Sequence, residues 1–195
     1  MLYILLKYLL KPIVWLLYRP KIKGRENLRI DGHAIFVCNH ISMLDPVIIM
    51  MASPRIVHFM AKAELFHGVV GNLLFRALLA FPVNRSQMDM VSLKKAMRVL
   101  QAGKVFGIFP EGKRTITEDM DVLEKGAAFL AGRSGAPIVP MYIRRDSFRR
   151  MRVVMIVGEP ICVSDIVANT PKSKMVDALT NEIDRALHAL QAAVE

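Results

Sequence analysis

The hydrophobic pattern of this chain changes after about the first 20 residues, from one long apolar stretch to short apolar runs separated by polar segments. The runs are rich in β-branched and aromatic residues, and such runs are typical of strands that are buried on both faces. They predict a sheet that is covered on both sides. The runs lie at residues 34–38, 56–60, 105–109, 137–141 and 153–157.

Segments with helical periodicity lie between and after these runs, at residues 46–51, 66–79, 88–101, 123–133 and 172–194. The last segment has one apolar face, because its hydrophobic residues recur every three or four positions. Alternation of strands and helices predicts an α/β fold, a layered and mostly parallel sheet flanked by helices. After residue 30 the chain has no internal repeat, low-complexity linker or change of composition, so one domain is expected.

The first 18 residues are the most hydrophobic part of the chain, but Lys7, Lys11 and Pro12 interrupt them. A membrane-spanning helix needs about 20 mostly apolar residues, so this segment fits that role poorly. Lys7 and Lys11 share one helical face, and leucines with Trp15 fill the rest, which is typical of a helix in the bilayer interface. We predict an amphipathic membrane-associating segment at residues 1–25. A buried core helix is the alternative; a signal peptide lacks a cleavage site here.

Net charge supports this placement. The chain has 195 residues and a formal charge of +10, with 53% hydrophobic residues, which fits one well-filled core and excludes a disordered chain. Residues 1–25 carry six cations and no acid, and residues 144–152 carry five arginines and one aspartate, so these segments hold the whole excess. This distribution argues against nucleic acid as a partner and indicates two basic patches that face something anionic. The first patch is expected to meet anionic lipid. The second fits an acidic carrier protein, lipid headgroups or a solvated turn.

The cysteines, Cys38 and Cys162, each lie in an apolar run. Buried free thiols are the simpler expectation, and a disulfide between them is the alternative. No Cys/His cluster has the spacing of a zinc site, so no metal is expected.

His40 follows the run at 34–38, at the carboxyl end of a predicted strand, where ligand sites of open α/β sheets lie. Asp45 comes five residues later. A carboxylate that folds back onto an imidazole fixes its tautomer and stabilises its charged form, as a general base requires. The alternative is that Asp45, just before Pro46, only begins a helix. These residues alone leave both interpretations open.

Three further segments carry candidate chemistry. In the loop at residues 109–115, Gly112 permits close backbone approach, and Lys113, Arg114 and Thr115 supply donors of the kind that hold phosphate. Arg85 lies in the loop at 81–86, and a guanidinium suits phosphate because it can make two parallel hydrogen bonds. Each loop is equally typical of a solvated turn. The segment at 136–141 is an apolar strand with two prolines, which predicts core or edge packing.

Together and in this order, the four blocks resemble those of the glycerolipid acyltransferase family, specifically the 1-acylglycerol-3-phosphate acyltransferases. Residues 39–45, Asn-His-Ile-Ser-Met-Leu-Asp, match the His-four-residues-Asp pattern, and the block around Arg85 matches the phosphate-binding arginine motif. Residues 109–115 match the Glu-Gly-x-Arg motif, and residues 136–140 match the proline-containing block. Lys113 stands where the family commonly has Thr or Ser, and Val83-Asn84 replaces a more usual pair before Arg85.

The resemblance implies a glycerol-3-phosphate acyltransferase type of α/β fold over residues 26–195. It also implies direct acyl transfer, without a cofactor, from acyl-CoA or acyl carrier protein to the sn-2 hydroxyl of 1-acylglycerol-3-phosphate, giving phosphatidic acid. Another lysophospholipid or a lyso-aminolipid is the alternative acceptor, and a non-catalytic membrane lipid-binding protein is the alternative function. With the basic first segment, the expected location is the cytoplasmic face of the cell membrane, as a peripheral or monotopic protein.

By position, the resemblance implies that His40 is the base and Asp45 its orienter. It implies that Arg85, Glu111 and Arg114 hold the phosphoglycerol of the acceptor. Donors for the developing oxyanion are expected from Lys62, near the transferring carbonyl, or from backbone N–H groups near Gly112.

Overall fold

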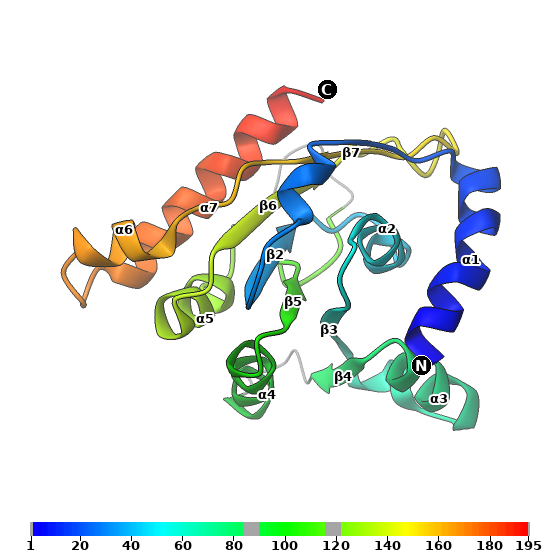
Figure 1. Cartoon of the computed structure of the whole chain (residues 1–195), viewed down its shortest axis with the longest axis horizontal. Helices are drawn as coiled ribbons and strands as arrows, with labels where there is room; N and C mark the ends of the chain where they lie inside the picture. Colours follow the sequence, from blue (N-terminus) through cyan, green and yellow to red (C-terminus); the bar gives the residue numbers. More distant parts are fainter. Residues whose placement is uncertain (1, 84–89, 116–121, 195) are drawn as a thin grey trace.

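Seven strands form one mixed sheet in the part of the chain that the computed structural model describes, residues 2–83, 90–115 and 122–194. Their order is β1-β7-β6-β2-β5-β3-β4 (Figure 1). β7 runs antiparallel to β6 and parallel to β1, and all other neighbours are parallel, so the predicted mostly parallel sheet is confirmed. The strands are β1 (Lys21–Lys23), β2 (Ala34–Cys38), β3 (Val57–Lys62), β4 (Ala80–Val83), β5 (Val105–Ile108), β6 (Ile138–Ile143) and β7 (Val154–Val157).

Helices cover both faces of this sheet. One face packs against α1 and α2, and the other packs against α4, α5, α6 and α7. Successive residues of β2 alternate between the two layers, with Phe36 on the first and Val37 on the second, and both are buried. The helices are α1 (Leu2–Tyr18), α2 (Asp45–Ala52), α3 (Val69–Ala77), α4 (Met90–Gln101), α5 (Gly126–Ser134), α6 (Val163–Ala168) and α7 (Met175–Ala192), with 3-10 turns η1 (Arg25–Leu28) and η2 (Ala63–Phe66).

The proline-containing strand was expected in the core or at an edge of the sheet, and the structure shows it in the core. β6 lies inside the sheet between β2 and β7, and all its residues are buried. Pro140 fits there because it faces β7 through its carbonyl, which accepts a hydrogen bond from Gly158 N at 2.8 Å. The β6–β7 pairing begins at the next residue, Met141 opposite Val157, so the missing N–H breaks no ladder bond.

The two edge strands, β1 and β4, and the short helix α6 were not predicted. β1 is Lys-Ile-Lys with both lysines exposed, and β4 contains Pro82. Charged residues and proline are tolerated at sheet edges, where one side of the strand has no neighbour to pair with. Neither strand therefore shows the buried apolar pattern that identifies the central strands.

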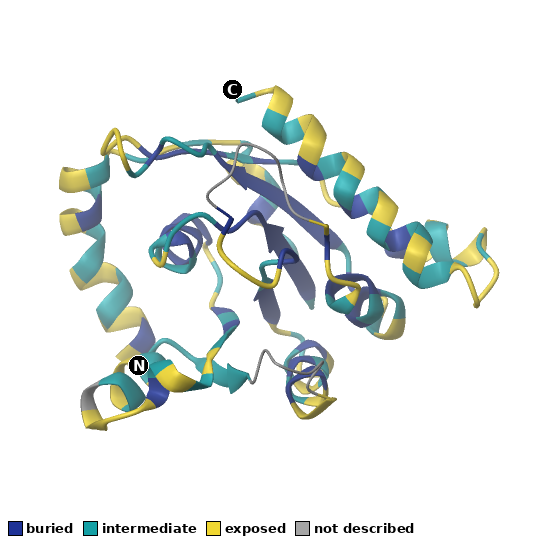
Figure 2. Cartoon of the chain, turned by 180° about the vertical axis from the view of Figure 1, so that it is seen from behind, coloured by how far each residue is buried: buried dark blue, intermediate teal, exposed yellow. Residues whose placement is uncertain are grey.

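Helix α1 packs one side, which carries Tyr3, Lys7 and Val14, against the body of the protein. The Tyr3 hydroxyl accepts a hydrogen bond from Val57 N at 3.2 Å, and Lys7 Nζ donates to Ser53 O at 2.5 Å. Burial lowers the pKa of Lys7, with smaller contributions from Lys11 and Arg25. Most large apolar side chains of α1 point outward instead, as the exposed positions in Figure 2 indicate. These are Leu2, Ile4, Leu5, Tyr8, Leu9, Ile13, Leu16 and Leu17.

The alternative of a buried core helix does not fit this exposure. None of the helices in the described ranges combines the length and the hydropathy that a bilayer crossing requires. The cysteines are both free: Cys38 is buried as expected, whereas Cys162 is exposed. Cys162 directly precedes α6 and lies outside the strand pairing that buries Cys38.

Candidate active site

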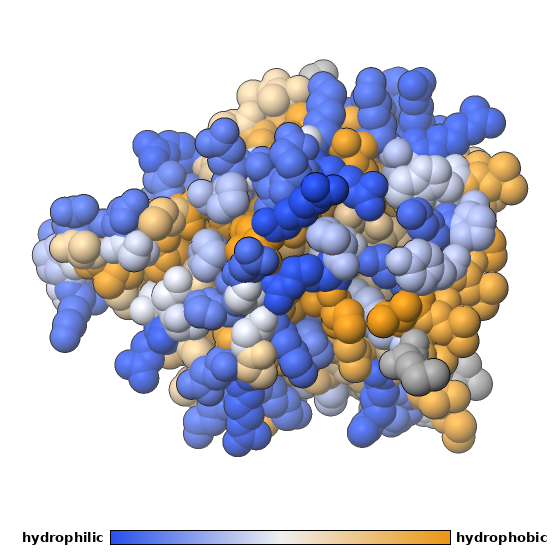
Figure 3. Space-filling view, in the orientation of Figure 1, coloured by the Kyte–Doolittle hydropathy of each residue, from blue (hydrophilic) through white to orange (hydrophobic). Residues whose placement is uncertain are grey.

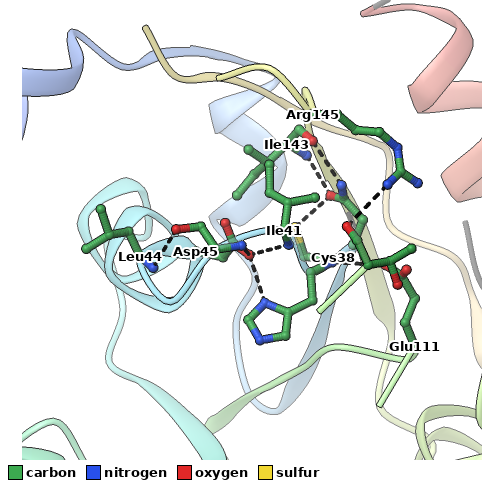
Figure 4. A network of polar contacts seen from close by, with 11 residues as sticks. Cys38, Ile41, Leu44, Asp45, Glu111, Ile143 and Arg145 are labelled. Atoms are coloured by element: carbon green, nitrogen blue, oxygen red, sulfur yellow. Dashed lines mark hydrogen bonds and ion pairs between the residues drawn. The ribbon is translucent and has the colours of Figure 1, made fainter. Parts of the chain in front are cut away.

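The candidate residues gather where the parallel strands end. His40 follows β2, the loop 109–115 follows β5, and Arg145 follows the neighbouring strand β6. Because β5, β2 and β6 are adjacent and parallel, their carboxyl ends meet at one edge of the sheet. Figure 4 shows these segments converging around Asp45, the first residue of α2.

His40 and Asp45 form a buried pair. His40 Nδ1 lies 2.8 Å from Asp45 Oδ2, and the two residues are 7% and 0% exposed. The same carboxylate oxygen accepts hydrogen bonds from Ile41 N at 2.7 Å and Ser42 N at 2.8 Å. Burial raises the pKa of Asp45 above its usual value, against the lowering effect of these hydrogen bonds. The N-cap of α2 is Leu44, so Asp45 does not cap the helix but folds back onto the turn before it.

This contact orients the imidazole. With Nδ1–H donating to Asp45, the lone pair of His40 is on Nε2, which makes no hydrogen bond within the described residues. The ring stacks on Phe109 with centroids 4.1 Å apart and 19° between planes, and Phe109 stacks on Phe59 at 5.9 Å. Gly107 makes room for Phe59, because a Cβ at this position would lie 2.3 Å from the Phe59 ring.

The loop after β5 holds the peptide unit of His40 from two directions. Glu111 Oε1 accepts a hydrogen bond from His40 N at 3.0 Å, and Thr115 N donates to His40 O at 2.8 Å. Gly112 allows the loop to turn, since its φ of 67° is in the left-handed region. Glu111 is buried and bonds the backbone of His40, while the contact with the acceptor that the resemblance implied stays a prediction.

The predicted cations differ in where they lie. Arg114 is exposed beside this loop and has no side-chain hydrogen bond or ion pair within the described ranges. Lys62 ends β3 at the same edge of the sheet, but its ammonium pairs with Glu64 at 3.0 Å and half of its side chain is exposed. Arg85 lies outside the described residues.

Two residues of the site were not predicted to belong to it. Asn39 exchanges two hydrogen bonds with the backbone of Ile143, at 2.9 Å and 2.7 Å. Arg145 Nη1 donates to Thr115 O at 3.4 Å, while its Nε and Nη2 are buried and have no hydrogen-bond partner among the described residues. The sequence contained an indication of Asn39, which is a polar residue at the end of an apolar strand and beside a candidate base. Such a residue needs a hydrogen-bond partner when it is buried. Arg145 resembles its neighbours in the arginine run, so the sequence does not distinguish it.

Metal ligands are not gathered here. Within residues 2–83, 90–115 and 122–194, no group of three or more His, Cys, Asp or Glu side chains is arranged to hold a metal ion. The arrangement instead provides one oriented imidazole with a buried carboxylate behind it, which is suited to accepting a proton from a hydroxyl.

Known proteins share both the sequence and the fold of this chain. A 1-acyl-sn-glycerol-3-phosphate acyltransferase of Bacillus subtilis is 30% identical over 188 residues, which cover 93% of this chain and 93% of that protein. The 1-acyl-sn-glycerol-3-phosphate acyltransferase LPAT1, chloroplastic, of Arabidopsis thaliana is 27% identical, with 83% of this chain and 49% of that protein covered. The crystal structure of the 1-acyl-sn-glycerophosphate (LPA) acyltransferase PlsC of Thermotoga maritima has the same fold, with a TM-score of 0.69 and 24% identity over 95% of this chain and 81% of that one.

The family model described as Acyltransferase matches residues 19–144. This match runs from the end of α1 to the end of β6 and includes His40, Asp45 and the loop 109–115. It therefore covers more than half of the chain, including these residues, and ends one residue before Arg145. The chain belongs to the acyltransferase family.

Proposed function

We propose that this protein transfers an acyl group from a thioester to the sn-2 hydroxyl of 1-acylglycerol-3-phosphate, giving phosphatidic acid. The observation that carries the proposal is the buried pair of His40 Nδ1 and Asp45 Oδ2 at 2.8 Å, with Nε2 unoccupied at the carboxyl edge of the sheet. The names of the related proteins support this choice of reaction.

His40 acts as a general base in this proposal. As the acceptor oxygen attacks the thioester carbonyl, Nε2 takes the hydroxyl proton, which contributes about 10² to 10⁴ in rate. The C–O bond forms, the C–S bond breaks, and the imidazolium returns the proton to the leaving sulfur. Asp45 holds the tautomer and stabilises the imidazolium.

A covalent acyl-enzyme is not needed, because the thioester is already activated. The nearest side chains that could serve as nucleophiles are unsuited to the role. Cys38 is fully buried, and burial, followed by Asp45 and Glu111, raises the pKa of its thiol well above the usual range. Ser42 Oγ accepts a hydrogen bond from Leu44 N at 3.1 Å, and within the described residues it makes no hydrogen bond to a base. Both observations favour direct transfer.

We assign the acceptor phosphate to Arg114 and Arg85. Arg114 offers an exposed guanidinium on the loop in which Glu111 and Thr115 bond the backbone of His40. Arg85 is assigned here by its motif alone. Substitution of Arg114 by alanine is expected to raise the KM for a phosphate-bearing acceptor and to leave the KM for the donor nearly unchanged.

The exposed apolar face of α1 is proposed to lie in the interface of the cell membrane, on its cytoplasmic side. The outward leucines and isoleucines form a continuous helical stripe, while Tyr3 and Lys7 tie the opposite stripe to the protein body. The acceptor and the product both carry acyl chains, so the enzyme would meet them at the membrane surface in which they reside.

The test is a transfer assay with the purified full-length chain, in which acyl-CoA and acyl carrier protein donors are each crossed with lysophosphatidic acid and other lysophospholipids. We expect transfer to lysophosphatidic acid, loss of transfer in His40→Ala, and normal turnover in the control His188→Ala, whose histidine is exposed on α7. Circular dichroism would show that both variants fold. Near-normal turnover of His40→Ala would contradict the mechanism, and preference for another acceptor would contradict the assigned substrate.

A further inference from the structure

The two basic segments of the sequence lie together in the fold. We call residues 144–152, the connection between β6 and β7, the arginine hairpin. Val153 N, just after it, donates to Tyr18 O at 2.9 Å, and Lys21 N donates to Val153 O at 2.8 Å. The rings of Tyr18 and Phe148 meet edge to face with centroids 5.6 Å apart. The arginine hairpin is thus fixed against the carboxyl end of α1 (Figure 1).

Only some of these cations are available to a partner. Arg144 and Arg150 share Asp146, with N–O distances of 2.5 Å and 2.6 Å, and Arg145 points toward Thr115. The remaining cations of the joined region are exposed and have no side-chain hydrogen bond or ion pair within the described part of the chain. They are Arg19, Lys21, Lys23, Arg149 and Arg152.

One apolar side chain is exposed between the arginines of the arginine hairpin. Met151 is 50% exposed and has a φ of 48°, a left-handed conformation that non-glycine residues adopt at a cost. Hydrogen bonds from Met151 N to Phe148 O at 3.2 Å and from Arg152 N to Ser147 O at 2.9 Å hold this turn. An outward methionine between arginines can enter the headgroup layer while the arginines stay at its surface.

The arginine hairpin also lies at the edge of the sheet that carries His40, because it follows the carboxyl end of β6. The exposed stripe of α1 ends at the same place, where Leu16 is 76% exposed. Figure 3 shows the hydrophobic margin along α1, with hydrophilic side chains at the end where the arginine hairpin lies. A cationic cluster that continues an apolar stripe complements both layers of an anionic bilayer surface, the headgroups and the acyl region.

We propose that the arginine hairpin is a second membrane contact, which binds anionic phospholipid headgroups through Arg149 and Arg152 and inserts Met151 among them. The inference rests on the membrane attachment by α1 proposed above. An acidic carrier protein is the less suitable partner. Its charge would complement the arginines, but it would leave the adjoining apolar stripe of α1 without a contact. Contact through both α1 and the arginine hairpin would hold the sheet edge that carries His40 near the headgroups.

The experiment compares vesicle binding by the full-length chain and two double variants. Arg149→Gln/Arg152→Gln removes the proposed contact, and Lys94→Gln/Arg98→Gln removes the same charge from exposed positions on α4, on the other face of the sheet. Binding is measured by flotation with phosphatidylcholine vesicles and with vesicles that also contain phosphatidylglycerol, at low and high salt. We expect the first variant to bind the anionic vesicles roughly tenfold or more weakly than the second, with a smaller salt dependence.

On neutral vesicles the two variants should bind equally, since α1 is intact in both. Equal binding of the two variants to anionic vesicles would overturn the inference. The inference would also be overturned if Arg149→Gln/Arg152→Gln bound vesicles normally but selectively lost transfer from acyl carrier protein in detergent. That result would assign the arginine hairpin to the carrier protein. Transfer in detergent micelles from acyl-CoA should be unchanged in both variants, so a failure of the proposed acyl transfer is recognised separately.

Discussion

Asn39 and Ile143 exchange two hydrogen bonds, in which Asn39 Nδ2 donates to Ile143 O at 2.9 Å and Ile143 N donates to Asn39 Oδ1 at 2.7 Å. The pairing of β2 with β6 ends at Cys38 opposite Met141, so the side-chain amide continues this ladder beyond the strand. The backbone of residue 39 is then free to turn, and His40 leaves the sheet at a fixed place. Asn39 is therefore a positioning residue for the proposed base.

Substitution Asn39→Ala should leave two buried backbone groups of Ile143 unpaired. The expected loss of unfolding free energy is about 2 to 4 kcal/mol, and kcat should fall more than KM changes, because the substrate itself is not touched. Urea unfolding and steady-state kinetics measure both. Asn169→Ala is the matched control, since Asn169 is exposed and, among the described residues, its side chain bonds only to Asp165 O. Equal unfolding free energies of the two variants would show that the two hydrogen bonds between Asn39 and Ile143 do not stabilise the fold.

Substitution Asp45→Asn should separate stability from catalysis. Burial raises the pKa of Asp45, so the folded protein holds this proton more tightly than the unfolded chain does. The contribution of Asp45 to stability is then present at low pH and is lost as pH rises through the raised pKa. Asparagine keeps an acceptor for Ile41 N and Ser42 N without that charge.

We therefore expect Asp45→Asn to be at least as stable as the wild type near pH 7, with an advantage that shrinks toward about pH 3. Turnover should fall by about 10² to 10⁴, because the imidazolium loses its counter-charge. Denaturant unfolding at several pH values and single-turnover kinetics check the two parts. Full turnover in a correctly folded Asp45→Asn would remove Asp45 from the mechanism.

The local part of the site was predictable from sequence, and the long-range part was not. His40 and Asp45 are five residues apart, so one turn between a strand and a helix brings them together. The contact between Glu111 and His40 joins residues 71 positions apart and exists only because β5 pairs with β2. Hydrophobic periodicity does not predict the order of strands in a sheet, because buried strands show the same pattern whether they are neighbours or lie far apart.

Orientation was the other quantity that the sequence did not determine. The pattern of α1 predicts an amphipathic helix, but not that Lys7 points at Ser53 O while Leu16 points outward. Likewise Arg144 and Arg145 are chemically identical neighbours, and only the fold turns one toward Asp146 and the other toward Thr115. Charge patterns locate cations along the chain, whereas their partners follow from tertiary structure.

Substitution Gly107→Ala should disturb the imidazole indirectly. The new methyl group would lie 2.3 Å from the Phe59 ring, and Phe59 stacks on Phe109, which stacks on His40. Displacement of this stack should lower kcat about tenfold or more and destabilise the fold by about 1 to 3 kcal/mol. Gly126→Ala is the control, because its Cβ would meet its nearest neighbours only at 4.0 Å. Similar kcat values for the two variants would count against a role of the ring stack.

Substitution Arg145→Met should raise stability and lower turnover. Two of the guanidinium nitrogens, Nε and Nη2, are buried without a partner in the described part of the chain, which costs free energy that an apolar side chain would not. Loss of the contact with Thr115 O should loosen the loop that binds His40 O. Thermal unfolding and kcat report the two effects. Arg144→Met, which breaks only the pair with Asp146, should keep its turnover; an equal fall in both variants would contradict the positioning role.

The anchor of α1 makes a prediction at alkaline pH. Burial raises the pKa of Tyr3 to about 12 from its usual 10.0, so the folded protein retains the phenolic proton longer than the unfolded chain. This contribution to stability is complete below about pH 10 and is lost as pH rises toward 12, a loss on the order of 2 kcal/mol. Tyr3→Phe should lose about 1 kcal/mol at neutral pH, since Val57 N loses its acceptor, but should decline less between about pH 9 and 11.5. Tyr8→Phe, exposed on the same helix, should follow the wild type in denaturant unfolding across this range; if Tyr3→Phe declines as steeply as Tyr8→Phe, the buried hydroxyl does not titrate with the fold.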